Sequence, residues 1–251
     1  MTSNVFEDQG IQFKVISPEM YGDVLDFLWE NFFPEEPLFR SMGITRGPLV
    51  DKYLFPEVFK QNCSIAALDS TGNILAVRVG IIKNKSSWNA WFQDKMFAAF
   101  PYRLFSNFLS PFVQKVPVLL KLQKTIEFNV WKKFDGWNCQ SVYEVISQCY
   151  SLLYSSYHFS LQGLAVCSAR SHGVRGLGSE VVRRCEDLAK EKGCGYTYLL
   201  ATGNYSRRLF AGLGYTHLNT LTYAEFRDEQ GELYLKDTRE HIAATTWSKP
   251  L

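Results

Sequence analysis

The sequence has almost no excess of charge of either sign. Its 27 lysines and arginines nearly balance its 25 aspartates and glutamates, which leaves a formal net charge of +2 over 251 residues. Proteins that bind nucleic acid or polyanionic membrane surfaces concentrate basic residues on one face. The near balance therefore predicts neither a nucleic-acid partner nor a membrane partner.

Cysteine pairs with the spacing of metal ligands are also lacking. Six cysteines are present, but no two have CxxC spacing and no histidine cluster stands near them. A zinc site is therefore not expected, and we predict that the protein uses no metal. The first ten residues, MTSNVFEDQG, contain no hydrophobic signal region. We therefore expect reduced thiols in a cytoplasmic protein.

No uninterrupted hydrophobic run is long enough for a membrane span. The most apolar segment, residues 104–122, contains two prolines as well as Gln114 and Lys115. A membrane helix needs ~20 consecutive apolar residues. Hydrophobic residues make up 46% of the chain and charged residues 21%, a balance that is typical of globular proteins. We expect a single domain over residues 1–251, present as a monomer or a homodimer.

Hydrophobic periodicity predicts a mixed α/β fold. Strands are expected at residues 11–16, in a hairpin formed by 63–69 and 74–82, and at 159–166, 196–201, 216–226 and 241–247. Helices are expected from Ser17, which can cap, to about Phe32, and at residues 179–193 and 206–214. Residues from about 84 to 156 are expected to form a mainly helical insert, and they contain many aromatic side chains.

A glycine-rich loop follows the strand that is expected to end at Val166. Gly173, Gly176 and Gly178 precede a helix that begins near Ser179. Backbone N–H groups at a helix N-terminus favour an anion, and glycines let a pyrophosphate approach the backbone. The loop matches neither GxxxxGK before Ser or Thr nor GxGxxG, which argues against a P-loop and a Rossmann site. The alternative is a turn that only connects the strand to the helix.

The segment RSHGVRGLGSEVVRRCEDLAKEKG resembles the acetyl-CoA signature of GNAT-superfamily acetyltransferases, in which Arg or Gln precedes Gly-x-Gly/Ala at the start of a long helix. Gly176 and Gly178 take the glycine positions, and Gly173 stands where the family has Arg or Gln. The resemblance implies that acetyl-CoA is the cosubstrate. It implies coenzyme contacts at Leu164, Ala165, Val166, Arg170, Gly173, Val174, Arg175, Gly176, Leu177, Gly178 and Ser179.

Two further segments are similar to motifs of insect arylalkylamine N-acetyltransferase-like proteins. Residues 201–215, ATGNYSRRLFAGLGY, resemble a motif in which a Tyr-Ser pair opens a helix that ends in Leu-Gly-Phe/Tyr. Residues 31–43, NFFPEEPLFRSMG, resemble the N-terminal motif Phe-Phe-x-x-Glu-Pro-Leu. The resemblance implies the GNAT fold, with a central, mostly antiparallel sheet, flanking helices and a helical insert. It adds coenzyme contacts at Asn204, Ser206 and Arg207 and substrate contacts at Phe33, Glu35 and Pro37.

By the same resemblance, Glu36 is the catalytic base. An amine must lose a proton to attack a thioester, and a carboxylate among apolar groups has a raised proton affinity. The alternative is that Glu35 and Glu36 are exposed acids between two prolines. The catalytic acid is less defined. Phe210 stands where many GNAT enzymes have a tyrosine, and Ser168 and Ser171 are the candidate catalytic serines.

These patterns together predict an enzyme that transfers the acetyl group of acetyl-CoA to the primary amine of a small molecule. The transfer is expected to occur by direct attack in a ternary complex. The aromatic side chains of residues 88–137 suit an aromatic amine, so an arylalkylamine is the expected substrate. Two alternatives stay open: a polyamine or guanidinoalkylamine as the acceptor, or a coenzyme-binding protein without catalysis.

Overall fold

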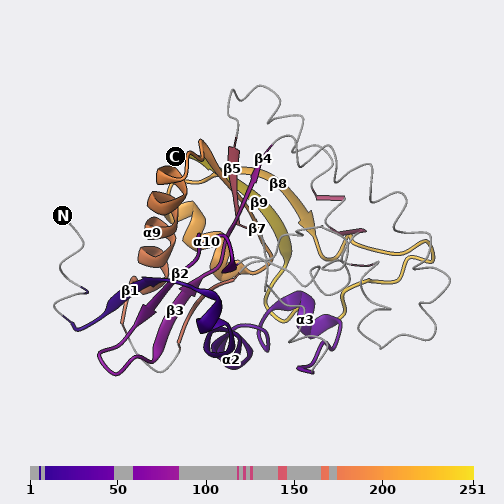
Figure 1. The fold of residues 1–251 in the computed structure, drawn as a ribbon. Coiled ribbons are helices and arrows are strands. Elements are labelled where there is room, and N and C mark those ends of the chain that lie inside the picture. The colour runs from indigo at the N-terminus through magenta and orange to yellow at the C-terminus, as the bar shows by residue number, and fades with distance from the viewer. Residues whose placement is uncertain are drawn as a thin grey trace.

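The computed structural model describes residues 6, 9–47, 59–84, 118, 121–122, 125–126, 141–145, 165–169 and 174–251. The strands are Gln12–Val15 (β1), Ile65–Leu68 (β2), Ile74–Arg78 (β3), Ile81–Asn84 (β4), Ser141–Val145 (β5), Val166–Ser168 (β6), Tyr196–Ala201 (β7), Thr216–Thr222 (β8) and Ala243–Pro250 (β9). The helices are a short 3₁₀ helix at Pro18–Met20 (η1) and α-helices at Tyr21–Asn31 (α2), Pro37–Ser41 (α3), Leu177–Glu191 (α9) and Asn204–Gly212 (α10). This mixture of strands and helices confirms the predicted α/β class (Figure 1).

The first sheet has the strand order β1-β2-β3-β6, and its pairs are antiparallel. The hairpin of β2 and β3 is confirmed, because the two strands pair directly. The Asp69 carboxylate fixes the turn between them by accepting hydrogen bonds from the N–H groups of Thr71 and Asn73, each at 2.9 Å. Gly72 has a φ of 92°, a left-handed conformation that favours glycine.

The second sheet has the order β4-β5-β7-β9-β8, and β5–β7 is the parallel pair among the described strands. β5 lies inside the predicted insert, so the expectation of a mainly helical segment is wrong at residues 141–145. The sequence of β5, SVYEV, is rich in β-branched and aromatic residues, which favour a strand. The insert is otherwise described only at residues 118, 121–122 and 125–126, which are helical.

α9 covers the first sheet and contacts β2, β3 and β6. Its buried side chains recur at helical spacing, as at Val181 and Cys185, because a helix with one apolar stripe packs that stripe against a sheet. The helix begins at Leu177, two residues earlier than predicted. Its end is as predicted, because Gly193 follows the last turn with a φ of 81°. Figure 1 shows α9 on one side of these strands and α2 on the other.

The N-terminal helix is divided into η1 and α2. Ser17 precedes η1, but its side chain does not cap the backbone, so that part of the prediction is wrong. The Ser17 hydroxyl is instead hydrogen-bonded to the Glu19 carboxylate, which lowers the pKa of Glu19. α2 buries Val24 and Leu28 and contacts β3 and β6. The turn that follows α2 is therefore anchored to the first sheet.

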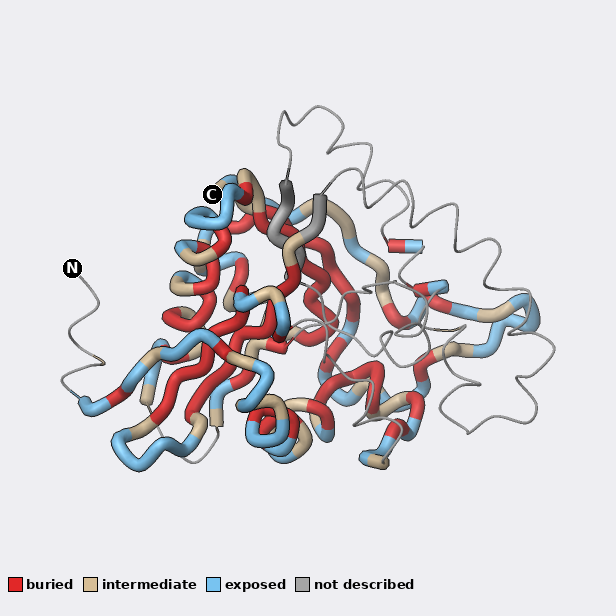
Figure 2. Tube along the Cα trace, viewed as in Figure 1, coloured by how far each residue is buried: buried red, intermediate tan, exposed pale blue. Residues whose placement is uncertain are grey.

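The hydrophobic core lies along the strands and the inner sides of the helices (Figure 2). Ile16, Leu28, Val77, Val181 and Leu199 are among its buried side chains. No helix in the described part of the chain is long and apolar enough to cross a lipid bilayer. Of the apolar segment at 104–122, only residues 118, 121 and 122 belong to that part.

Candidate active site

β6 forms the edge of the first sheet beside β3. The Ala165 carbonyl and the Ala169 N–H both make hydrogen bonds toward β3, at 3.1 and 2.7 Å. Because backbone groups alternate in direction along a strand, those of Val166 and Ser168 face the other edge. No described strand pairs with that edge. An extended polar ligand can therefore pair with the backbone of β6.

β6 also reaches further than the sequence predicts. The strand was expected to end at Val166, but it continues through Cys167, which pairs with Val77 of β3, to Ser168. Ser168, a candidate catalytic serine, is therefore an exposed strand residue and does not lie in a loop. The extension depends on pairing with β3, which the short apolar run before it does not reveal.

The N-terminus of α9 has no side-chain cap. Its first intrahelical hydrogen bond runs from the Glu180 N–H to the Gly176 carbonyl at 3.0 Å, so the N–H groups of Leu177, Gly178 and Ser179 have no partner within the helix. Gly176 has a φ of 85°, which favours glycine. A Cβ at Gly178 would meet no described atom within 4 Å. An uncapped helix N-terminus with this much room suits a phosphate group.

The other predicted coenzyme contacts of this loop are described only in part. Arg175 is exposed, and Val174 packs against the core. The residues that lie outside the described part of the chain are Leu164, Arg170, Ser171 and Gly173. Their roles stay predictions.

Glu36 is buried at the N-terminus of α3, with 3% of its surface exposed. Its backbone is extended, with φ −70° and ψ 121°, as expected for a residue that precedes a proline. Its Oε2 accepts a hydrogen bond from the Phe39 N–H at 2.7 Å. The carboxylate therefore caps the helix, and Pro37 takes the first helical position. The alternative in which Glu36 is an exposed acid is wrong.

An aromatic cluster supports the Glu36 turn. The Phe33 ring stacks on Phe39 with a centroid distance of 4.4 Å and contacts Trp29 at 4.7 Å. Phe33 and Pro37, the predicted substrate contacts beside Glu35, are both buried. Their contacts with substrate stay predictions.

Tyr223 is a buried residue that bonds to the end of β7. The Tyr223 hydroxyl donates a hydrogen bond to the Thr202 carbonyl at 2.5 Å, directly after β7. Burial raises the pKa of Tyr223 well above its usual value, the charge of Glu36 raises it further, and Arg207 opposes the rise. The charges of Glu36 and Arg207 therefore both act on the buried phenol, which is hydrogen-bonded directly after β7.

Polar groups at the start of α10 bond to their neighbours. The N-cap residue is Gly203, and no side chain caps the helix. The Asn204 N–H donates to Nδ1 of His241 at 3.1 Å, and the Ser206 hydroxyl donates to the Gly203 carbonyl at 2.9 Å. Arg207 Nη1 lies 3.5 Å from the Asn204 side-chain oxygen. The coenzyme contacts of Asn204, Ser206 and Arg207 stay predictions.

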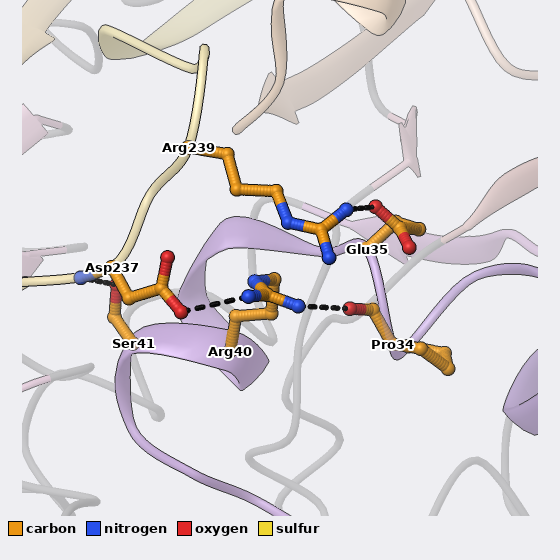
Figure 3. A network of polar contacts seen from close by, with 6 residues as sticks. All are labelled: Pro34, Glu35, Arg40, Ser41, Asp237 and Arg239. Atoms are coloured by element: carbon orange, nitrogen blue, oxygen red, sulfur yellow. Dashed lines mark hydrogen bonds and ion pairs between the residues drawn. The ribbon is translucent and has the colours of Figure 1, made fainter.

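The connection between β8 and β9 docks on α3 through a polar network (Figure 3). Arg40 Nη2 lies 2.8 Å from the Asp237 carboxylate, and Arg40 Nη1 donates to the Pro34 carbonyl at 3.5 Å. Arg239 forms an ion pair with Glu35. Glu35 therefore lies in a charged, partly exposed network, whereas its neighbour in sequence is buried as a helix cap. The substrate contact predicted for Glu35 stays a prediction.

Sequence reasoning missed Tyr223 and His241. Tyr223 follows β8 and His241 precedes β9, in segments that match none of the motifs above. No spacing relates them to the start of α10, and only the fold brings them to it, where they bond to the Thr202 carbonyl and the Asn204 N–H. In the described part of the chain, no group of three or more His, Cys, Asp or Glu side chains could hold a metal ion.

Comparison with known proteins agrees with the family resemblance. Residues 142–215 match the family model described as the acetyltransferase (GNAT) family. This segment runs from β5 through the glycine loop, α9, β7 and α10. No curated protein sequence matches the chain significantly.

Several solved structures share the fold. Arylalkylamine N-acetyltransferase 2 from Aedes aegypti is similar with a TM-score of 0.72 and 23% identity, over 96% of this chain and 98% of that chain. An agmatine N-acetyltransferase has a TM-score of 0.70 and 19% identity, over 96% and 100%. A polyamine N-acetyltransferase from Drosophila melanogaster has a TM-score of 0.68 and 21% identity, over 96% and 100%. The predicted GNAT fold is confirmed.

Proposed function

From its GNAT fold and the GNAT match of residues 142–215, we propose that the protein transfers the acetyl group of acetyl-CoA to the primary amine of a small molecule. The observation that carries this proposal is the buried carboxylate of Glu36 at the N-terminus of α3. A carboxylate withdrawn from bulk water among apolar and aromatic groups is suited to accept a proton.

The residues of β6 and α9 fit the coenzyme. The outward backbone groups of Val166 and Ser168 can pair with the amide groups of the pantetheine arm. The N–H groups of Leu177, Gly178 and Ser179 can bind the pyrophosphate, with the helix dipole favouring its negative charge. When bound there, acetyl-CoA supplies the acetyl group as a reactive thioester.

Glu36 then acts as the base. It takes the proton that the amine loses as the amine nitrogen bonds to the acetyl carbon and displaces the sulfur. Phe210, buried against Tyr215 at a centroid distance of 5.1 Å, has no proton to donate. The departing thiolate is a weak base compared with an alkoxide, because its parent thiol is already fairly acidic. Ser168 and Ser171 stay the candidate catalytic serines.

An arylalkylamine is the first candidate for the acceptor, as in the enzyme from Aedes aegypti. A guanidinoalkylamine or polyamine is the second, because the agmatine and polyamine N-acetyltransferases resemble this fold to a similar degree. A coenzyme-binding protein without catalysis is the third possibility.

A thiol-release assay with a panel of amines tests the proposal. The protein is mixed with acetyl-CoA and, in separate reactions, with tryptamine, tyramine, agmatine and spermidine, and free CoA is measured over time. Turnover with the aromatic amines supports the first candidate, and turnover with agmatine or spermidine alone supports the second. Binding of acetyl-CoA without turnover for any primary amine would contradict the proposed enzyme and support the third possibility.

A further inference from the structure

Arg78, the last residue of β3, is a buried cation with unpaired hydrogen-bond donors. It has 1% of its surface exposed, and its Nε and Nη2 have no hydrogen-bond partner among the described residues. Its guanidinium lies over the Phe210 ring, with Cζ 5.0 Å from the centroid. Beyond Phe210, the Tyr215 hydroxyl donates to the Glu186 carboxylate at 2.7 Å, and Lys249 Nζ lies 2.6 Å from the other oxygen. That carboxylate is therefore already engaged. Because buried polar groups are normally hydrogen-bonded, the two donors of Arg78 call for another acceptor.

The Arg78 side chain extends from one sheet to the other beside β6. Its Cα pairs in register with that of Val166 in β6, and residues opposite each other on antiparallel strands share a face. Phe210, which the guanidinium contacts, belongs to α10, and α10 contacts β7 and β9 of the second sheet. The guanidinium therefore lies beside the strand whose free edge is proposed to bind the pantetheine arm.

The first sheet defines which end of β6 is close to the proposed phosphate site. Ser168 lies in one row of paired residues with Phe13 of β1, through the two intervening strands. The Phe6 ring packs against Phe13 at a centroid distance of 6.0 Å, and its Cζ would stand 3.8 Å from a Cβ at Gly176. The start of α9 therefore lies at the Ser168 end of β6.

This arrangement gives the coenzyme one direction along β6. Acetyl-CoA has its pyrophosphate at one end of the pantetheine arm and its sulfur at the other. A pyrophosphate at the start of α9 directs the arm from Ser168 toward Val166, the residue that pairs with Arg78. The sulfur is therefore expected at the end of β6 where the unpaired donors of Arg78 are buried.

We propose that Arg78 is a catalytic residue that donates hydrogen bonds to the coenzyme sulfur and stabilises the thiolate that leaves during acetyl transfer. This inference rests on the proposed function. As the amine nitrogen bonds to the acetyl carbon, the carbon–sulfur bond breaks and the sulfur keeps the electron pair, while Glu36 takes the amine proton. An arginine side chain keeps its proton in proteins, so it stabilises the thiolate by charge and hydrogen bonds alone. Such donors act most strongly where water is excluded, and this role needs no acid at Phe210.

Substitution of Arg78 separates this role from a structural one. Arg78→Met keeps a long side chain but removes the charge and the donors, and Arg78→Lys keeps the charge. Removing a donor of this kind lowers kcat by ~10²–10³-fold, so we expect this loss for Arg78→Met and a smaller one for Arg78→Lys. An apolar side chain in place of a buried charge is often neutral or stabilising, so Tm should not fall for Arg78→Met. The control is Arg184→Met, because the Arg184 guanidinium also lies over a ring, that of Phe13 at 3.9 Å. It should keep the wild-type kcat.

The decisive measurement does not depend on turnover. Calorimetry compares the affinities for CoA and for desulfo-CoA, which lacks the sulfur atom, at about pH 6 and about pH 9, on either side of the range in which a thiol ionises. A donor to the thiolate lowers the pKa of the bound thiol, so in the wild-type protein the preference for CoA should rise by about tenfold or more toward the higher pH. In Arg78→Met this rise should disappear, whereas Arg184→Met should keep it.

The same rise in both the wild-type protein and Arg78→Met, or no rise in either, would overturn the contact with sulfur and leave the enzyme function standing. A kcat of Arg78→Met that equals that of the wild-type protein, or falls only in step with Tm, would overturn the catalytic role. A wild-type protein that binds acetyl-CoA but acetylates no amine would overturn the proposed function itself, together with any role of Arg78 in catalysis.

Discussion

Replacing Glu36 by glutamine separates the helix-capping role of its carboxylate from its proposed role as the base. The glutamine oxygen can still accept the hydrogen bond that the Phe39 N–H donates at 2.7 Å, but an amide cannot take a proton from the amine. Loss of a general base typically lowers the rate by ~10²–10⁴-fold. We therefore expect kcat to fall by this factor, the acidic limb of the kcat–pH profile to disappear, and the KM for acetyl-CoA to change little.

The effect on stability distinguishes this variant from Glu36→Ala. Phe39 is buried, with 1% of its surface exposed, so alanine leaves its N–H unpaired at a cost of about 1–3 kcal/mol. Glutamine keeps the bond but loses its charge, and a neutral acceptor is roughly half as strong as an ionised one. Urea unfolding should therefore show a clear loss of stability for Glu36→Ala and a smaller one for Glu36→Gln, while both lose the same factor in kcat.

The control is Glu30→Gln, which makes the same charge change on an exposed residue of α2. It should keep the kcat of the wild-type protein. A Glu36→Gln variant with near-wild-type kcat would refute the base assignment and leave Glu36 as a helix cap only. A larger loss of kcat in Glu35→Gln than in Glu36→Gln would show that the motif had been aligned one residue out of register.

Four further outcomes are expected. Gly178→Leu should weaken acetyl-CoA binding by about tenfold or more, ~1.4 kcal/mol, without lowering Tm. The control Gly212→Leu replaces a glycine of α10 with similar open space and should leave acetyl-CoA binding unchanged. An unaltered calorimetric affinity for Gly178→Leu would contradict the proposed coenzyme site. A double-mutant cycle of Arg40→Ala and Asp237→Ala in urea unfolding should give a coupling of about 0.2–1 kcal/mol, because both side chains are partly exposed. Activity should survive EDTA, and ultracentrifugation should find no species larger than a dimer; a loss of activity that zinc restores would argue against the metal-free enzyme. Burial raises the pKa of Cys63 to about 12, so at pH 8 iodoacetamide should label it only after unfolding, as mass spectrometry of its peptide would reveal.

Much of the fold could be predicted because its signals are local. The strand at Tyr196–Ala201 has the predicted bounds, and the β2–β3 hairpin and the helix end at Gly193 occur where glycine and polar turn residues indicate them. Each of these features depends on a few neighbouring residues. Alternation of apolar and polar residues indicates a strand, and a glycine that adopts a positive φ indicates the end of a helix. Two of the errors lie where a partner distant in sequence decides. β5 forms inside the predicted helical insert by pairing with β4 and β7, and β6 reaches Ser168 by pairing with β3.

The candidate site likewise has features that neighbouring residues predict and features that only packing between distant residues decides. The motif around Glu36 predicted the base, and the proline after it predicted the extended backbone that the structure has. Burial of the carboxylate among Phe33 and Phe39 follows from packing, which no single-residue preference reveals.

By itself, the sequence determined the class of the fold, the glycines at the start of α9 and the residue proposed as the base, because short runs of neighbouring residues indicate each of them. Only the tertiary structure decided what surrounds that base and the start of α10. Tyr223 follows β8 and His241 precedes β9, and pairing between these strands brings both residues to the segment that joins β7 to α10. Their contacts depend on distances between segments remote in sequence, and those distances exist only once both sheets have formed.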